Sequence, residues 1–252
     1  RRTVKRMSVV LRWSLRENLK SKMFLMFLGI MLIATIPAVL GMSSAFEGII
    51  AEGSLEEMQI KLSWIMGMTC YMCAFLAMGV GVIVLASDPI TKEKARGTIE
   101  SLMATPLKTK DVWLGKSLSA FFPSLILGVL VTGIVVVVLN YLYIVPAVGH
   151  FVLPTPVTIS SFLLVPLIIL GLNLLVIYVA MTGNPRYAQG IAVLAFVVVI
   201  NAVAQLGARG IIDFISWDFT LFNIGIAALL GGATIFLSRL LTKERVVLSS
   251  KG

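Results

Sequence analysis

Charged side chains are scarce in this sequence. Asp, Glu, Lys and Arg make up 13% of its 252 residues, hydrophobic residues make up 58%, and the mean hydropathy is +1.00. Soluble domains carry about 25% charged residues. The composition therefore excludes an ordinary soluble domain and predicts an all-α integral membrane protein.

The few charges are also almost absent from the long apolar runs. Six runs are long enough to cross a bilayer as helices, and Arg239, next to the end of the sixth, is the only Asp, Glu, Lys, Arg or His in them. Proton-driven carriers, voltage sensors and intramembrane hydrolases need ionisable side chains at that depth. Energy for uphill transport would therefore come from another polypeptide. We place the spans of a single transmembrane domain, 23–241, at about 23–42, 62–86, 118–142, 159–182, 190–207 and 221–240.

Cysteine is rare as well, with two residues, and both lie in the second span. Met66, Cys70 and Cys73 fall on one helical face, and their sulfur atoms suit soft ions such as Cu(I). The same residues are ordinary packing residues, and a second cysteine pair is missing. A self-sufficient channel or soft-metal carrier remains one alternative, although we expect no resident metal.

Lys and Arg are distributed unevenly between the two sides of the predicted spans. Nineteen of the 21 lie in 1–22, 87–117, the turn at Arg186 and the segment from Arg239 to the end, including the tail 242–252. Because short basic loops stay cytoplasmic, we expect both termini inside. The net charge of +9 then reflects membrane insertion. No nucleic-acid role is expected, because no folded domain carries a basic groove.

Two further segments are predicted to be amphipathic. In 1–22 the apolar residues repeat at helical steps, which predicts a basic helix lying in the inner membrane interface. Residues 209–220 are predicted to re-enter the outer interface. The apolar residues of the first helix are Val4, Met7, Leu11, Leu15 and Leu19.

The polar segment 87–117 separates the second and third spans. Asp88 and Pro89 predict a helix start, and Pro106 ends a second short helix that begins after Thr98. Ile99, Leu102 and Met103 share one face of that second helix. A helix of two turns needs packing against something else, so this one is a candidate docking element.

The end of the same segment, Gly115-Lys116-Ser117, has the letters that end a phosphate-binding loop. Lys110 stands where that motif requires glycine, so no nucleotide site is predicted here. We instead expect Lys116 and Trp113 to be interfacial anchors at the start of the third span.

Amides are the most polar groups inside the predicted spans. Asn173, Asn201 and Gln205 are the deepest of them. Such side chains either line a pathway or hold helices together by hydrogen bonds, and the sequence leaves both roles open.

The segment also carries a pattern of fixed spacing, E-x-x-x-G-T-x-E-x-L-x-x-x-P-x8-G-K, from Glu93 to Lys116. It resembles the signature between the second and third spans of type-2 ATP-binding-cassette (ABC) exporter permeases. The six-span layout extends the resemblance loosely over the whole chain. Many family members have a second acidic residue after the first, and here that position is Lys94.

The resemblance implies a multi-pass permease subunit of a prokaryotic plasma membrane. It would pair with a second copy and two ATPase subunits, have no catalytic site of its own, and leave ATP and Mg to those partners. The implied ATPase-coupling residues are Glu93, Gly97, Thr98, Ile99, Glu100, Leu102 and Met103. In that family the substrate cavity lies between the second and fifth spans of the two copies, which implies Phe75, Phe196 and Asn201 as lining residues. Together with the deep amides, the candidate pathway residues are Phe75, Asn173, Phe196, Asn201 and Gln205. A membrane anchor or assembly factor for an ATPase remains a further alternative.

Overall fold

The computed structural model describes residues 2–20, 22, 24–26, 28–31, 33, 35, 46, 48–49, 55–96, 107–242, 244 and 246. These residues form helices and connecting turns, with no strand among them, which confirms the all-α prediction. The helices are α1 (Arg2–Lys20), α3 (Leu55–Ala95), α5 (Thr109–Leu139), α6 (Val145–Val148), α7 (Thr155–Ile159), α8 (Val165–Thr182), α9 (Pro185–Ala208) and α10 (Trp217–Leu240), with π-helical turns η1 (Asn140–Ile144) and η2 (Ser160–Leu164).

Five helical stretches in the described part of the chain are long and apolar enough to cross a membrane. They correspond to the second to sixth predicted spans, with identical bounds for the fifth and an earlier start for the other four. The first predicted span, 23–42, lies largely outside the described residues. The five stretches are Glu56–Leu85, Thr109–Val148, Thr155–Thr182, Gly190–Gly207 and Trp217–Leu240.

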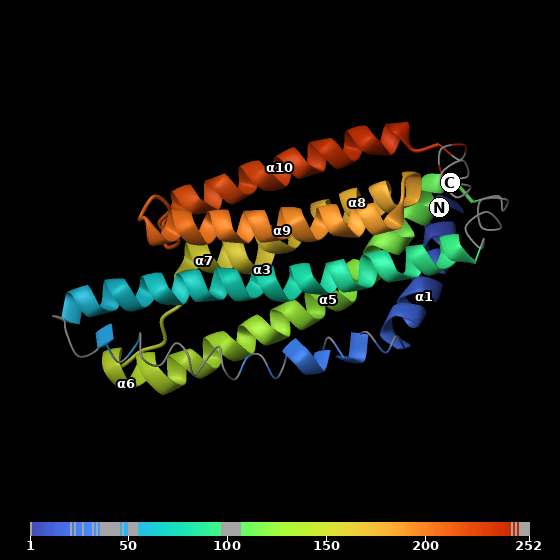
Figure 1. The fold of residues 1–252 in the computed structure, drawn as a ribbon. Helices are drawn as coiled ribbons and strands as arrows, with labels where there is room; N and C mark the ends of the chain where they lie inside the picture. The colour runs from blue at the N-terminus through green and yellow to red at the C-terminus, as the bar shows by residue number, and fades with distance from the viewer. Residues whose placement is uncertain are drawn as a thin grey trace.

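The helices form an elongated bundle in which α3 and α5 pack against each other most extensively (Figure 1). Helix α1 packs on α5, and α10 packs on α8. One end of the bundle, called the basic end below, gathers α1 and the loop-facing ends of the long helices (Figure 1). Those ends are Ala95 of α3, Thr109 of α5, Thr182 of α8, Pro185 of α9 and Leu240 of α10.

Helix α3 extends beyond its apolar stretch. It runs without interruption from Leu55 to Ala95, so the predicted helix start at Asp88 and Pro89 is wrong. A proline removes one backbone donor and disturbs the preceding turn, but packing can maintain a helix through it. With 41 residues, α3 is about 60 Å long, roughly twice the thickness of a bilayer's hydrocarbon core.

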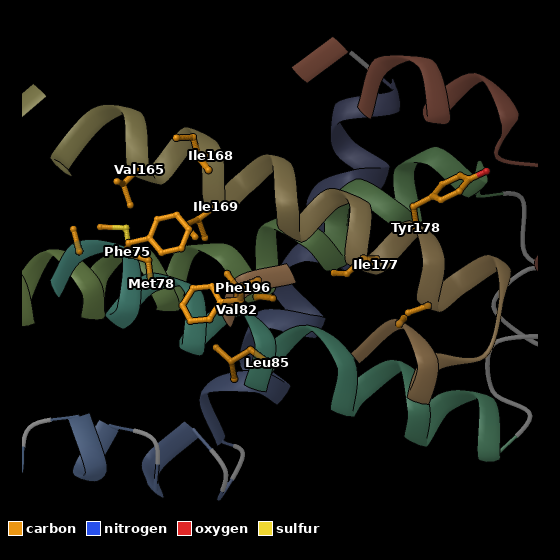
Figure 2. Packing of buried hydrophobic residues seen from close by; sticks show 14 of the residues in the cluster. Phe75, Met78, Val82, Leu85, Val165, Ile168, Ile169, Ile177, Tyr178 and Phe196 are labelled. Carbon is orange, nitrogen blue, oxygen red and sulfur yellow. The ribbon is translucent and has the colours of Figure 1, made fainter. Parts of the chain in front are cut away.

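The main hydrophobic core lies where α3, α5, α8 and α9 meet. In Figure 2, Phe75, Met78 and Val82 of α3 lie close to Ile169 of α8 and Phe196 of α9. A second core at the far end of the bundle contains buried residues of α3, α5 and η1, including Leu62, Met66, Cys70, Leu139 and Ile144. The long helices are thus held together along most of their length.

Residues 209–216 form turns, and Trp217 begins α10. Phe214 is fully buried, and its ring centroid lies 5.8 Å from that of Trp64 and 5.0 Å from that of Phe219. The side chain of Ser216 caps α10 by accepting a hydrogen bond from the backbone N–H of Phe219. This connection is therefore anchored in the bundle by one aromatic side chain, and entry of the 209–220 segment into the outer interface stays a prediction.

Candidate functional site

The two ends of the sequence pattern meet at the basic end of the bundle. Lys116, in the third turn of α5, forms an ion pair with Glu93 on the extension of α3. The two side chains are 3% and 12% exposed, respectively, so water screens the pair little. The pair joins α3 to α5 directly across the intervening loop.

The position of Lys116 corrects a sequence prediction. Lys116 is not an interfacial anchor, because α3 covers it and supplies a carboxylate. Trp113 is also buried, at 3% exposure, and its Nε1–H donates to the backbone carbonyl of Leu174 in α8 at 3.0 Å. Both residues therefore connect helices instead of facing lipid.

Lys94, the residue after Glu93, has a contact of its own. Its ammonium donates a hydrogen bond to the backbone carbonyl of Gly183, between α8 and α9. Partial burial lowers the pKa of Lys94 from its usual value. Consecutive residues of α3 thus connect to α5 and to the α8–α9 turn.

Gly115 of the pattern allows α1 to approach α5 closely. A Cβ atom at this position would lie 2.9 Å from Cγ1 of Val10, which is closer than packed carbon atoms come. One turn further along α5, the hydroxyls of Ser119 and Ser14 lie 2.8 Å apart. The side chain of Asn18 donates to the backbone carbonyl of Ser119 at 3.1 Å. Helix α1 is therefore docked by a narrow face of small and polar residues.

This docking face differs from the apolar face predicted for the leader. Val10, Ser14 and Asn18 are buried against the bundle, whereas Leu19 is 44% exposed. Leu11 and Leu15 are intermediate in exposure. The side chains of Val4 and Met7 lie outside the described residues. The helix itself is confirmed, and its position in a membrane interface stays a prediction.

Most of the predicted coupling residues lie in the segment 97–106. Gly97, Thr98, Ile99, Glu100, Leu102 and Met103 lie outside the described residues. Only Glu93 of the set is described, in its pair with Lys116. The described residues on either side of this set are Arg96, which follows α3, and Leu107, which precedes α5.

The predicted pathway residues do not gather in one site. Phe75 and Phe196 are buried and stacked, with ring centroids 5.2 Å apart. Asn173 is fully buried between α8 and α5, where its amide donates to the carbonyl of Ser117 at 2.6 Å. Asn201 and Gln205 instead lie on the exposed face of α9. Of the two roles left open by the sequence, Asn173 therefore has that of holding helices together by a hydrogen bond. The two amides of α9 face away from their own bundle.

The sulfur-containing residues of α3 belong to packed surfaces. Met66 and Cys70 are fully buried in the second core, and Cys73 packs against it. No group of three or more His, Cys, Asp or Glu side chains among the described residues is arranged to hold a metal ion.

Two polar contacts at depth were not predicted. The hydroxyl of Tyr71 in α3 donates to the side-chain carbonyl of Asn223 in α10 at 2.7 Å. Asn140 begins η1 and accepts a hydrogen bond from the backbone N–H of Val152 at 2.8 Å, which ties down the far-end connection. The only sequence signal for these residues was their polar character near apolar runs, which does not identify a partner.

Comparisons with protein-family models, with curated proteins and with solved structures found no match to this chain.

Proposed function

We propose that this chain is the membrane permease subunit of an ATP-driven exporter. It works as a homodimer in a prokaryotic plasma membrane, with six spans and both termini in the cytoplasm. Each copy receives mechanical input from a separate ATPase subunit through the segment 97–106. The chain has no catalytic site, and ATP and Mg bind to the ATPase.

The observation that carries this proposal is the junction at the basic end. The sequence pattern begins at Glu93 and ends at Lys116, and these two residues form an ion pair in which Lys116 is buried. A loop fixed in this way at its base presents its central residues as a unit to a partner. Its motion is also passed to α3 and α5 together, since the two helices are cross-connected just beside it.

The exposed face of α9 supports the homodimer. Asn201 and Gln205 are exposed within the apolar stretch Gly190–Gly207. The Asn201 amide donates to the carbonyl of Val197 in its own helix at 2.9 Å, which leaves its oxygen as an acceptor. Amides in hydrocarbon need polar partners. A second copy placed against this face would supply partners or complete a polar pathway.

Substitution in the coupling segment tests the proposal. The tagged chain would be co-expressed with each candidate ABC ATPase of the source genome in turn, isolated in mild detergent, and reconstituted for ATP hydrolysis and transport measurements. We expect Glu100→Arg to reach wild-type expression but to lose transport with the partner, because reversing this charge disturbs orientation at the ATPase groove.

Glu57→Arg is the matched control, because Glu57 is an exposed glutamate near the start of α3, at the opposite end of that helix. It should behave as wild type. Wild-type transport by Glu100→Arg would contradict the proposed coupling. Stable binding of the ATPase without any flux would instead favour a membrane anchor.

A further inference from the structure

A cavity of about 150 Å³ lies between α3, α8 and α9. All of the residues that line it are apolar, and they include Val82 of α3, Ile169 and Val176 of α8, and Ala188, Ala192 and Phe196 of α9. Figure 2 shows Val82, Ile169 and Phe196 gathered where these helices meet. The cavity is separate from the ion pair and from the exposed amides of α9.

The chemistry of the lining limits what can occupy this cavity. A buried water needs two to four polar partners, and an apolar cavity of about 150 Å³ stays dry and accepts a benzene-sized hydrocarbon. The walls here provide no hydrogen-bonding side chain. An occupant of this cavity is therefore a hydrocarbon group of about that size.

The position of the cavity identifies the source of that hydrocarbon. Val179 and Ile191 line it and are 36% and 60% exposed, so it opens sideways between α8 and α9. Both residues belong to stretches that are long and apolar enough to cross a membrane, so the opening faces acyl chains. Val179 lies one helical turn before Gly183, whose carbonyl accepts the hydrogen bond from the Lys94 ammonium. The Lys94 ammonium thus lies beside the α8–α9 turn, next to the opening.

We propose that this cavity binds one acyl chain of a phospholipid from the leaflet at the basic end. The terminal or middle part of the chain lies against Ala188, Ala192 and Phe196, and the headgroup lies near the α8–α9 turn. This site does not depend on an ATPase partner or on the direction of transport, so its test is independent of the proposed function.

Photolabelling of the purified full chain in lipid vesicles tests the site. The probe is a phosphatidylglycerol with a diazirine on one acyl chain, and labelled peptides are identified by mass spectrometry. We expect labelling concentrated on the cavity-facing parts of α8 and α9. Ala192→Phe fills the cavity and should lower this labelling about tenfold, as expected when two or more methylenes are excluded.

Ala202→Phe is the matched control, because Ala202 is exposed on the same helix and does not line the cavity. It should keep wild-type labelling at the cavity. Ala192→Leu serves if the larger substitution prevents folding, as judged by size-exclusion chromatography, and it should lower labelling by a smaller factor. Equal effects of the substitutions at 192 and 202, or labelling spread evenly over exposed α9, would overturn the site.

A second arm of the experiment distinguishes the sources of the acyl chain. A diazirine fatty acid and a diazirine diacylglycerol are compared with the phospholipid probe at the same concentration. Stronger cavity labelling by the phospholipid is expected, because its phosphate complements the positive charge of Lys94. Equal or stronger labelling by either of the other two probes would overturn the assignment to phospholipid.

Discussion

At the residue scale, the most consequential contact is between Glu93 and Lys116. The Lys116 side chain is 3% exposed and is paired with the Glu93 carboxylate. A charge in such a place is costly unless a partner neutralises it, so removal of one partner costs more than the pair itself contributes. The two residues should therefore tolerate substitution together better than separately.

Substitution of Glu93 measures this dependence. Glu93→Gln leaves the Lys116 ammonium buried without its counter-charge, and we expect a loss of about 3–5 kcal/mol in stability. Thermal unfolding of the purified chain in detergent, followed by tryptophan fluorescence, gives the change. The charge-exchanged variant Glu93→Lys with Lys116→Glu should recover part of the loss.

Lys110→Met is the control for loss of a lysine from α5, because Lys110 is exposed. Its effect should stay within about 0.5 kcal/mol, as for other surface substitutions. Similar unfolding temperatures for Glu93→Gln and Lys110→Met would show that the ion pair does not stabilise the junction.

At the element scale, close approach of α1 to α5 depends on small residues. Gly115 admits Val10, and Ser119 meets Ser14 and Asn18 one turn further along. Small residues let helix backbones approach, and their short polar side chains then hydrogen-bond across the gap. The leader helix is thereby attached to the same part of α5 that holds the ion pair.

A double cysteine substitution tests this attachment. The hydroxyl oxygens of Ser14 and Ser119 lie 2.8 Å apart, so cysteines at both positions have their sulfur atoms within reach of a disulfide. In a background with Cys70→Ser and Cys73→Ser, we expect mild oxidation to cross-link the pair, visible as a mobility shift reversed by reductant.

Two companion variants make the cross-link informative. Arg12→Cys with Ser119→Cys should not cross-link, because Arg12 lies on the exposed face of α1. Gly115→Leu, added to the Ser14 and Ser119 pair, should lower the yield, because its side chain would occupy the space of Val10. Cross-linking of Arg12→Cys as efficiently as Ser14→Cys would argue against a fixed orientation of α1.

These elements also show which structural features a single sequence predicts. Hydropathy runs located five helices that are long and apolar enough to span a membrane, because the length of such a run is set by bilayer thickness and is recognised without any neighbour. The apolar repeat likewise predicted the helix α1. It did not identify the docking face, because Gly115 lies on another helix and determines which side of α1 can approach.

The errors at the junction have the same origin. Lys116 and Trp113 look like interface residues because they stand at the edge of an apolar run. Their burial depends on α3 and α8, which cover them from distant parts of the sequence. The pairing of Glu93 with Lys116 was likewise not predicted, although both belong to one pattern, because spacing alone does not show how the intervening loop folds back.

At the scale of the whole molecule, the long apolar helices alternate in direction and bring α1, the end of α3 and the end of α10 to one end of the bundle (Figure 1). The uneven distribution of Lys and Arg predicts that this end is cytoplasmic. The helix arrangement shows which residues share an end of the bundle, and the charge count predicts on which side of the membrane that end lies. Labelling one residue at each end tests this predicted sidedness.

Single cysteines in the background without Cys70 and Cys73 report sidedness. Ile211 is 66% exposed at the far end, so Ile211→Cys should react with a membrane-impermeant maleimide in intact cells. Arg96→Cys, exposed at the end of α3, should react only after permeabilisation. The reverse pattern would invert the topology and remove the segment 97–106 from the reach of any cytoplasmic ATPase.

The exposed amides of α9 give a prediction about assembly. Asn201→Cys should form a disulfide between two copies in the membrane if the two α9 helices face each other. Val203→Cys is the control, because Val203 is 8% exposed and faces its own bundle. Dimeric product is read on non-reducing gels. Equal dimer yields from both variants would contradict an interface on this face.

The ion pair at the base of the 97–106 segment also has a mechanical consequence. The ion pair between Glu93 and Lys116 joins the end of α3 to the start of α5. A force applied to the segment 97–106 therefore cannot move one of these helix ends while the other stays still. The force is shared, and α3, about 60 Å long and continuous, acts as a stiff rod that carries it to the far end of the bundle. A displacement of a few ångströms at one surface would thus arrive at the other as a tilt of two helices locked together.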